Sequence, residues 1–209
     1  MKKRILIMML ALTVMASQVK AQFITIDPAH IATSIINTAS EIIQTSSTVS
    51  NVITNWKEVK KVYDQSKEYY DKLKAVNDLV KDAKKVRDAI LIVGDISNIY
   101  VNEFEKMLSD PHFKYEELMA ISKGYTILLQ ESADMLMELK TVVNSNGLSM
   151  TDYERMDIIN YVYDRLKTHK NLVSYYTRKN ISVSYLRAQK AGDTERVLAL
   201  YGNIDERYW

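Results

Sequence analysis

The stretch VSNVITNWKEVKKVYDQSKEYYDKLKAVNDLVKDAKKVRDAILIV, residues 49–93, contains neither glycine nor proline and decides the fold class. Its apolar or small residues recur at steps of three and four. This spacing places their side chains on one face of a helix and approaches the 3.5-residue repeat of coiled coils. The stretch therefore predicts long helices that pack side by side. The apolar or small residues that recur at steps of three and four are Val49, Val52, Trp56, Val59, Tyr63, Ser66, Tyr70, Leu73, Val76, Val80, Ala83, Val86, Ile90 and Val93.

The helical pattern extends back to Pro28, since the 65 residues between Pro28 and Gly94 contain no further glycine or proline. An unbroken helix of that length would measure about 98 Å, at ~1.5 Å per residue. Residues 45–51, TSSTVSN, contain one apolar residue among seven, and their hydroxyls compete for backbone hydrogen bonds. We expect a kink or a short break there, and the sequence leaves open whether the helix bends or folds back.

The second half of the chain predicts further helices separated by turns. Gly94 is expected to end the long helix, and a shorter helix is expected to follow it from Asp95 to Leu108. A turn follows at residues 109–113, and another helix runs from Tyr115 to the turn at residues 144–147. Gly124 lies inside that helix, where glycine costs about 1 kcal/mol relative to alanine.

The last long helix is predicted from a capping box. Thr151 and Glu154 have the spacing at which each side chain bonds the free backbone amide at the other residue. No helix breaker follows until Gly192, after which Asp193 is expected to cap a short final helix. The residues predicted to face inward are Ile159, Val162, Leu166, His169, Leu172 or Val173, Tyr176 and Val183.

These patterns predict an all-α protein. No stretch alternates with period two over enough residues for a strand. We expect residues 22–209 to form one domain, an elongated three-helix bundle with long, coiled-coil-like helices. Residues 95–124 are expected to form a small helical appendage to it.

The first 21 residues have the pattern of a cleaved signal peptide. Basic residues at positions 2–4 precede an apolar run from Ile5 to Ala16, and the small residues Val19 and Ala21 fit a cleavage site before Gln22. Twelve residues in a helix reach about 18 Å, against ~30 Å of hydrocarbon in a membrane. The pattern therefore predicts export to the periplasm or cell envelope.

Composition limits what the exported chain can bind. Without residues 1–21 it has 24 Lys and Arg against 26 Asp and Glu, a net charge of −2. Nucleic-acid-binding domains are usually basic, so this balance does not favour nucleic acid. The chain contains no cysteine, so its stability must come from packing.

The sequence contains no grouping typical of a catalytic, cofactor or metal site. Its three histidines, His30, His112 and His169, are far apart, and no phosphate-binding glycine motif occurs. His169 lies at an inward helical position, where a hydrogen-bonded core histidine is expected. We therefore predict no catalytic residue, no cofactor and no metal, and a protein that is not an enzyme.

A basic segment and an acidic segment oppose each other. Residues 165–192 contain seven Lys or Arg and no Asp or Glu, whereas residues 95–139 have a net charge of −6. We expect charges on the flanks of these helices to pair. On a helix the seven cations form two stripes, so that one stripe can pair internally while the other stays free. The first stripe holds Arg165, Lys179, Arg187 and Lys190, and the second holds Lys167, Lys170 and Arg178.

Internal pairing and solvation are favoured for these cations, followed by a surface for a partner protein, and last by nucleic acid or lipid head groups. The membrane is expected to be contacted only peripherally. A C-terminal aromatic tail is expected to dock on the bundle or on a partner. The candidate partner surface comprises Arg165, Lys167, Lys170, Arg178, Lys179, Arg187, Lys190, Tyr175, Tyr208 and Trp209.

Three parts of the chain resemble a family of transfer proteins. They are KEYYDKLKAVNDLVKDAKKVRDAILIVGDISNIY (67–100), NGLSMTDYERMDII (146–159), and NLVSYYTRKNISVSYLRAQK (171–190) with RVLALYGNIDERYW (196–209). These strings resemble the TraI-type transfer proteins of Bacteroides-type conjugative transposons, which are unrelated to the relaxase of the same name. The chain is also distantly similar to TrbJ-like conjugal transfer proteins and to type IV secretion minor pilins.

The resemblance implies a non-enzymatic structural component of a conjugative type IV secretion apparatus. The minor pilins are helical bundles that assemble at or near the pilus tip on the cell surface. The expected partners are therefore pilus or channel subunits. The alternative is a periplasmic chaperone or assembly factor for other conjugation subunits.

Overall fold

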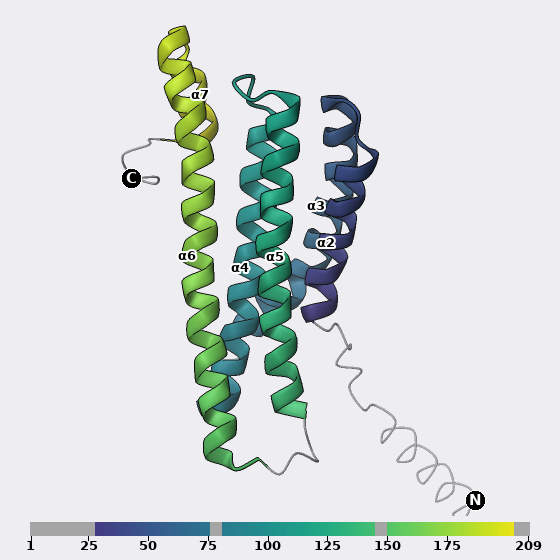
Figure 1. The fold of residues 1–209 in the computed structure, drawn as a ribbon, viewed down its shortest axis with the longest axis vertical. Helices are drawn as coiled ribbons and strands as arrows, with labels where there is room; N and C mark the ends of the chain where they lie inside the picture. Colours follow the sequence, from purple (N-terminus) through teal and green to yellow (C-terminus); the bar gives the residue numbers. More distant parts are fainter. Residues whose placement is uncertain (1–27, 76–80, 145–149, 203–209) are drawn as a thin grey trace, which may run out of the picture.

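The computed structural model describes residues 28–75, 81–144 and 150–202, and these ranges contain six α-helices and no strand. The all-α class predicted from the sequence is confirmed. Figure 1 shows the helices lying along the long axis of the molecule. They are α2 (Pro28–Thr45), α3 (Val49–Lys74), α4 (Lys81–Leu108), α5 (Tyr115–Asn144), α6 (Asp152–Ala191) and α7 (Thr194–Tyr201).

Helices α2 to α5 form a four-helix arrangement in which consecutive helices run in opposite directions (Figure 1). Each packs against the next, and α2 packs against α5. Helix α6 is a fifth long helix that packs against both α4 and α5, and α7 packs against α6. The predicted three-helix bundle is not confirmed, because the residues expected to form one long helix belong to α2, α3 and α4.

The polar stretch at residues 45–51 folds the chain back. Helix α3 packs along α2, and Thr48 caps it by accepting a hydrogen bond from the backbone N of Asn51 at 3.3 Å. The Asn55 amide donates to the hydroxyl of Ser46 at 3.2 Å, and the Tyr115 hydroxyl donates to the Ser46 carbonyl. The hydroxyls of this stretch therefore stabilise a turn between two helices and not a kink within one helix.

Gly94 does not end a helix, and the boundary predicted there is wrong. Helix α4 runs through it, and the ring of Tyr70 on α3 packs against its backbone. A Cβ atom at Gly94 would lie 2.8 Å from Cδ1 of Tyr70. Glycine is present because two helices approach closely. Residues 95–124, expected as an appendage, are the second half of α4, the turn after it and the start of α5.

A chain of aromatic rings crosses the bundle from α3 to α6. Trp56 meets Tyr100 with ring centroids 4.7 Å apart, Tyr100 stacks on Tyr125 at 4.7 Å, and Tyr125 meets Tyr176 edge-on at 5.1 Å. The Tyr125 hydroxyl also forms a 2.7 Å hydrogen bond with the hydroxyl of Thr177 on α6. These contacts join α6 to the four-helix arrangement through its middle, with ring geometries that add about 0.5–1.5 kcal/mol per pair beyond area burial.

Helix α6 begins and ends as the sequence predicts. The capping box of Thr151 and Glu154 is formed, and Gly192 closes the helix in the left-handed conformation at φ 71°. Five predicted inward residues are buried, with Val173 the buried one of the alternatives Leu172 and Val173, and Tyr176 is partly buried. Val183 is exposed, and Ile181 and Ser184 are buried instead. The prediction was wrong there because the buried positions advance by four residues through 169, 173, 177 and 181. The confirmed inward residues are Ile159, Val162, Leu166, His169 and Val173.

Candidate interaction surface

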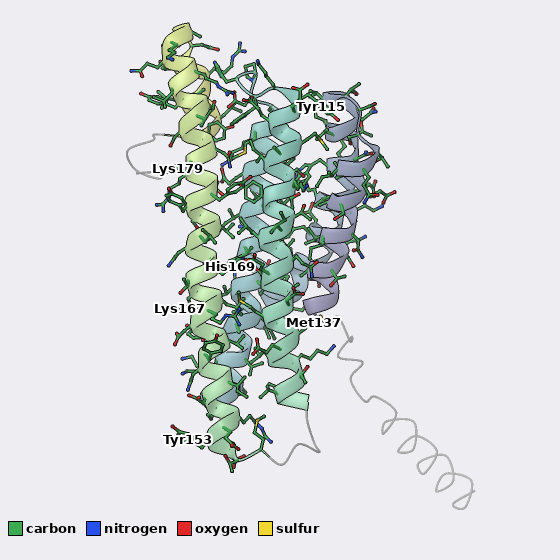
Figure 2. All side chains as sticks on the ribbon, in the orientation of Figure 1. Tyr115, Met137, Tyr153, Lys167, His169 and Lys179 are labelled. Atoms are coloured by element: carbon green, nitrogen blue, oxygen red, sulfur yellow. The ribbon has the colours of Figure 1, made fainter. Side chains whose placement is uncertain are left out.

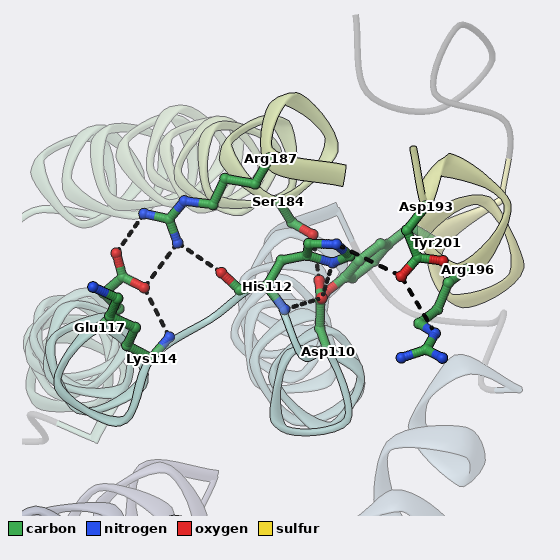
Figure 3. Close-up of polar contacts among 9 residues, drawn as sticks. All are labelled: Asp110, His112, Lys114, Glu117, Ser184, Arg187, Asp193, Arg196 and Tyr201. Carbon is green, nitrogen blue, oxygen red and sulfur yellow. Dashed lines mark hydrogen bonds and ion pairs between the residues drawn. The ribbon is translucent and has the colours of Figure 1, made fainter. Parts of the chain in front are cut away.

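Asp110, in the turn after α4, ties that turn to α6 and α7 (Figure 3). Its buried carboxylate accepts hydrogen bonds from the backbone N and Nδ1 of His112, both at 2.9 Å, and from the Tyr201 hydroxyl at 2.9 Å. The Ser184 hydroxyl on α6 donates to the same carboxylate. Burial and the neighbouring Asp110 raise the pKa of Tyr201 well above its usual value, so its hydroxyl remains a donor.

Asp193 does not cap α7 as the sequence predicts. Its side chain makes no capping hydrogen bond, and its carboxylate lies 3.8 Å from Nε2 of His112 and 3.6 Å from Nε of Arg196. The contact with His112 comes from the turn after α4, which lies about 80 residues earlier in the chain. Asp193 therefore extends the Asp110 network to the start of α7 (Figure 3).

The Asp110 network has the residue types of a hydrolytic site but not its geometry. The Ser184 hydroxyl is fully buried and donates to the carboxylate instead of to a histidine that could take its proton. Within the described ranges no three His, Asp or Glu side chains are grouped so as to hold a metal ion. The network's contacts are those of a structural clamp.

Arg187 holds the end of α6 against the start of α5. Its guanidinium donates to both carboxylate oxygens of Glu117, at 2.8 and 2.5 Å, and to the carbonyl of His112 at 2.7 Å. Glu117 also accepts from the backbone N of Lys114 at 2.8 Å. Hydrogen bonds from Arg187 and then from that amide lower the pKa of Glu117 to about 2.

Two more of the seven cations pair with acids. Arg165 lies 3.4 Å from Glu138 on α5, and Lys170 lies 2.7 Å from Asp95 on α4. The three acids that pair with cations of the segment 165–192 all belong to the segment 95–139, as expected. However, the paired cations come from both predicted stripes, because α6 lies between α4 and α5 and each stripe borders one of them.

The other four cations have no carboxylate partner among the described residues. Lys167 lies over the ring of Tyr163 at 5.5 Å, and Lys179 lies over the ring of Tyr175 at 5.3 Å. Figure 2 shows Lys167 and Lys179 on the outer side of α6. The remaining two cations are Arg178 and Lys190.

The outer face of α6 carries a second, exposed apolar row. Steps of three and four from Tyr161 to Lys190 select nine residues, and all nine are exposed. Six of the twelve exposed large apolar side chains in the described ranges lie on α6, and five of those six belong to this row, which makes it the main apolar surface. We name this row the α6 seam: Tyr161, Arg165, Thr168, Leu172, Tyr175, Lys179, Val183, Leu186 and Lys190.

Sequence reasoning selected the cations of the α6 seam and Tyr175 but missed its aliphatic members. The sequence predicts Val183 to face inward, leaves Leu172 or Val173 open for another inward position, and does not single out Leu186. The signal was the second three-and-four repeat within the same helix, offset from the buried one. Two such repeats in one helix indicate that both of its faces are suited to packing.

A groove of about 420 Å³ lies at one end of the α6 seam, between α5 and α6. His169 forms part of its wall and is buried, with Nε2 donating to the carbonyl of Leu128 at 2.7 Å and Nδ1 lying 3.5 Å from Glu131. Figure 2 shows His169 between the two helices. The predicted hydrogen-bonded core histidine is confirmed. The groove is lined by Met135, Tyr161, Asp164, Arg165, Thr168, His169 and Leu172.

Some predicted features lie outside the described residues. These are the cleavage site at Ala21 and Gln22 and the aromatic residues Tyr208 and Trp209. For the described helices, none combines the length and the apolar character needed to span a bilayer.

Comparison with known proteins gives one family match. A family model described as "Domain of unknown function (DUF4141)" matches residues 4–56, about a quarter of the chain. The match covers α2 and the first turns of α3 and ends before α6. No curated protein and no solved structure gives a significant match to the chain.

Proposed function

We propose that the protein is an exported, non-enzymatic structural component of a conjugative type IV secretion apparatus, similar in role to a minor pilin. It acts through contacts between its helix surfaces and pilus or channel subunits. The observation that carries this proposal is the α6 seam, a row of exposed apolar and basic side chains along one helix. The signal-peptide pattern of residues 1–21 and the resemblance to conjugal transfer proteins support the setting.

The α6 seam suits a contact role because its side chains are exposed while its helix is held in place. Leu172, Tyr175 and Leu186 expose about half of their surface, and apolar residues in a continuous row typically mark an interaction site. The adjoining sides of α6 are held by the aromatic chain through Tyr176 and by the Arg187–Glu117 pair. A partner would therefore meet a surface that needs little ordering on binding.

The test of this function is genetic. Deleting the gene from a conjugative element should abolish DNA transfer, and a plasmid copy should restore it. Nicking of the transferred DNA should continue in the deletion strain, because the proposal gives the protein no role in processing DNA. Transfer at the wild-type frequency without the gene would refute the proposal.

A periplasmic chaperone or assembly factor is the second candidate. The exposed seam and the neighbouring groove could equally hold a helix of another subunit before its assembly. Fractionation separates the two roles, since a structural component should be present in pili sheared from the cells. A chaperone should stay with the cells.

A further inference from the structure

We propose that the segment of the α6 seam from Leu172 to Lys190 binds an acidic amphipathic helix of another protein. This inference rests on the proposed function and specifies the chemistry of its partner. The segment contains four apolar side chains, Leu172, Tyr175, Val183 and Leu186, and two cations, Lys179 and Lys190.

The spacing of these residues fits a helix as the binding element. Apolar side chains at steps of three and four form the seam along which two helices pack. The segment from Leu172 to Lys190 is about 27 Å long at ~1.5 Å per residue, which matches a partner helix of roughly five turns. A partner that binds as an extended strand would instead pair with the edge of a sheet, and the described residues of this protein contain no sheet.

The charge of the segment requires acidic residues on the partner. Residues 165–192 contain no Asp or Glu. Arg187, at the edge of the segment, is occupied by Glu117, but Lys179 and Lys190 meet no carboxylate among the described residues. Lys179 lies within the apolar row, where a lysine favours a partner with acidic residues beside its own apolar row. Each exposed pair contributes only ~0.2–1 kcal/mol, so the charges select the partner more than they set the affinity.

A second copy of this chain fits the segment poorly. Two α6 seams packed together would bring Lys179 and Lys190 of both copies into one interface. Because α6 has no carboxylate between residues 165 and 192, it could not compensate these charges in either orientation. Like charges placed together in an interface disfavour association.

The segment also fits nucleic acid and membranes less well than an acidic helix. A phosphate backbone would pair with Lys179 and Lys190 but leave Leu172, Val183 and Leu186 without contacts. A membrane-binding helix places its cations beside its apolar face, whereas Lys179 lies in the middle of this one. An acidic amphipathic helix would pack against the apolar side chains of the segment and pair with its two lysines.

Two synthetic helical peptides test the inference. Both carry the same leucine seam over four heptads, and their flanking positions are all Glu in one and all Lys in the other. Binding of each labelled peptide to the purified chain is measured by fluorescence anisotropy. The acidic peptide should bind at least about tenfold more tightly, a factor that corresponds to 1.4 kcal/mol. Added salt should weaken its binding.

Variants locate the binding site. Leu186→Asp should abolish binding of the acidic peptide, and Lys179→Glu should shift the preference towards the basic one. Ile127→Asp is the matched control, since Ile127 is 51% exposed on α5 and Leu186 is 55% exposed. This control should bind like the wild type, and circular dichroism should show all three variants folded.

Several outcomes would overturn the inference. These are equal binding of the two peptides, no binding of either, and binding that Leu186→Asp leaves unchanged. The inference also falls if anionic lipid vesicles or a single-stranded oligonucleotide displace the acidic peptide from the segment. It falls again if sedimentation shows a dimer of the wild-type chain that Leu186→Asp dissociates.

The peptide assay and the deletion experiment fail independently. If the deletion abolishes transfer but the acidic peptide does not bind, the proposed function stands and the inference about its partner is wrong. If the peptide binds to the α6 seam but the deletion strain transfers DNA normally, the site is real and the conjugative function is wrong.

Discussion

The hydroxyl of Tyr176 on α6 occupies the space in which a side chain at Gly124 on α5 would begin. A Cβ atom at Gly124 would lie 2.2 Å from the Tyr176 oxygen, which donates a 3.2 Å hydrogen bond to the carbonyl of Ile121. The sequence suggests only that this glycine is a tolerable cost within a helix. The structure shows that it allows α6 to approach α5 and thereby position the α6 seam.

Gly124→Ala should therefore destabilise the protein, although alanine favours helices by ~1 kcal/mol over glycine. We expect a net loss of about 1–3 kcal/mol in the free energy of unfolding, because overpacking displaces the Tyr176 ring and its hydrogen bond. Urea denaturation, monitored by circular dichroism, measures this loss of stability. Tyr176→Phe removes the clashing oxygen, so the double variant should lose less than the sum of the single losses. A Gly124→Ala protein more stable than the wild type would contradict this packing.

Asp110→Asn should destabilise the junction of α6, α7 and the turn after α4. One carboxylate oxygen accepts hydrogen bonds from His112 and the other from Ser184 and Tyr201, so an amide nitrogen in place of either oxygen loses one of these two sets. We expect a loss of about 2–4 kcal/mol in the free energy of unfolding, which is typical of a broken buried network. Tyr201→Phe removes a single donor and should cost about 1 kcal/mol. Equal losses in the two variants would show that Asp110 is not the centre of the network.

The Glu117–Arg187 pair should make stability depend on pH in the acidic range. The pKa of Glu117 falls from its usual 4.5 to about 2 in the folded protein, so folding favours the ionised carboxylate. This contribution is complete above pH 4.5 and is lost as the pH falls towards 2. Because the pair is about one-third exposed, solvent screening reduces its contribution to roughly 1–2 kcal/mol.

Glu117→Gln isolates that contribution. Urea denaturation at a series of pH values between 4.5 and 2 should show a shallower loss of stability for the variant than for the wild type. Other carboxylates titrate equally in both proteins, so the difference between the curves reports Glu117. Parallel curves would mean that the ion pair does not form in solution.

Both ends of α6 could be predicted from the sequence, because each depends on residues close to it in the chain. The capping box of Thr151 and Glu154 and the glycine at position 192 mark the bounds of α6, and the structure has both. Each feature depends on residues within one turn, where sequence and geometry are directly linked. The heptad-like repeat likewise predicted the buried face of α3 from Val52 to Tyr70, although Val49 is exposed.

The features that the sequence did not reveal depend on contacts between distant segments. The sequence predicts a helix end at Gly94 because the Tyr70 ring that explains this glycine comes from another helix. The fold-back of α3 depends on packing against α2 and on Tyr115, which lies 69 residues beyond Ser46. The exposed row of α6 was hidden because it contains as many large apolar residues as the buried row. Only the position of the neighbouring helices shows which row remains uncovered.

The frequency of conjugative transfer in strains with a substituted α6 seam tests the central claim most directly. The variant Leu172→Asp with Leu186→Asp is compared with Ile127→Asp and Met137→Asp on α5. The two pairs are matched, with exposures of 47% and 55% in the seam and 51% and 54% in the control. Protein levels and thermal stability are measured in parallel. The account predicts that the seam variant transfers no better than the deletion strain while the control transfers normally. Wild-type transfer by a folded, normally abundant seam variant would contradict it.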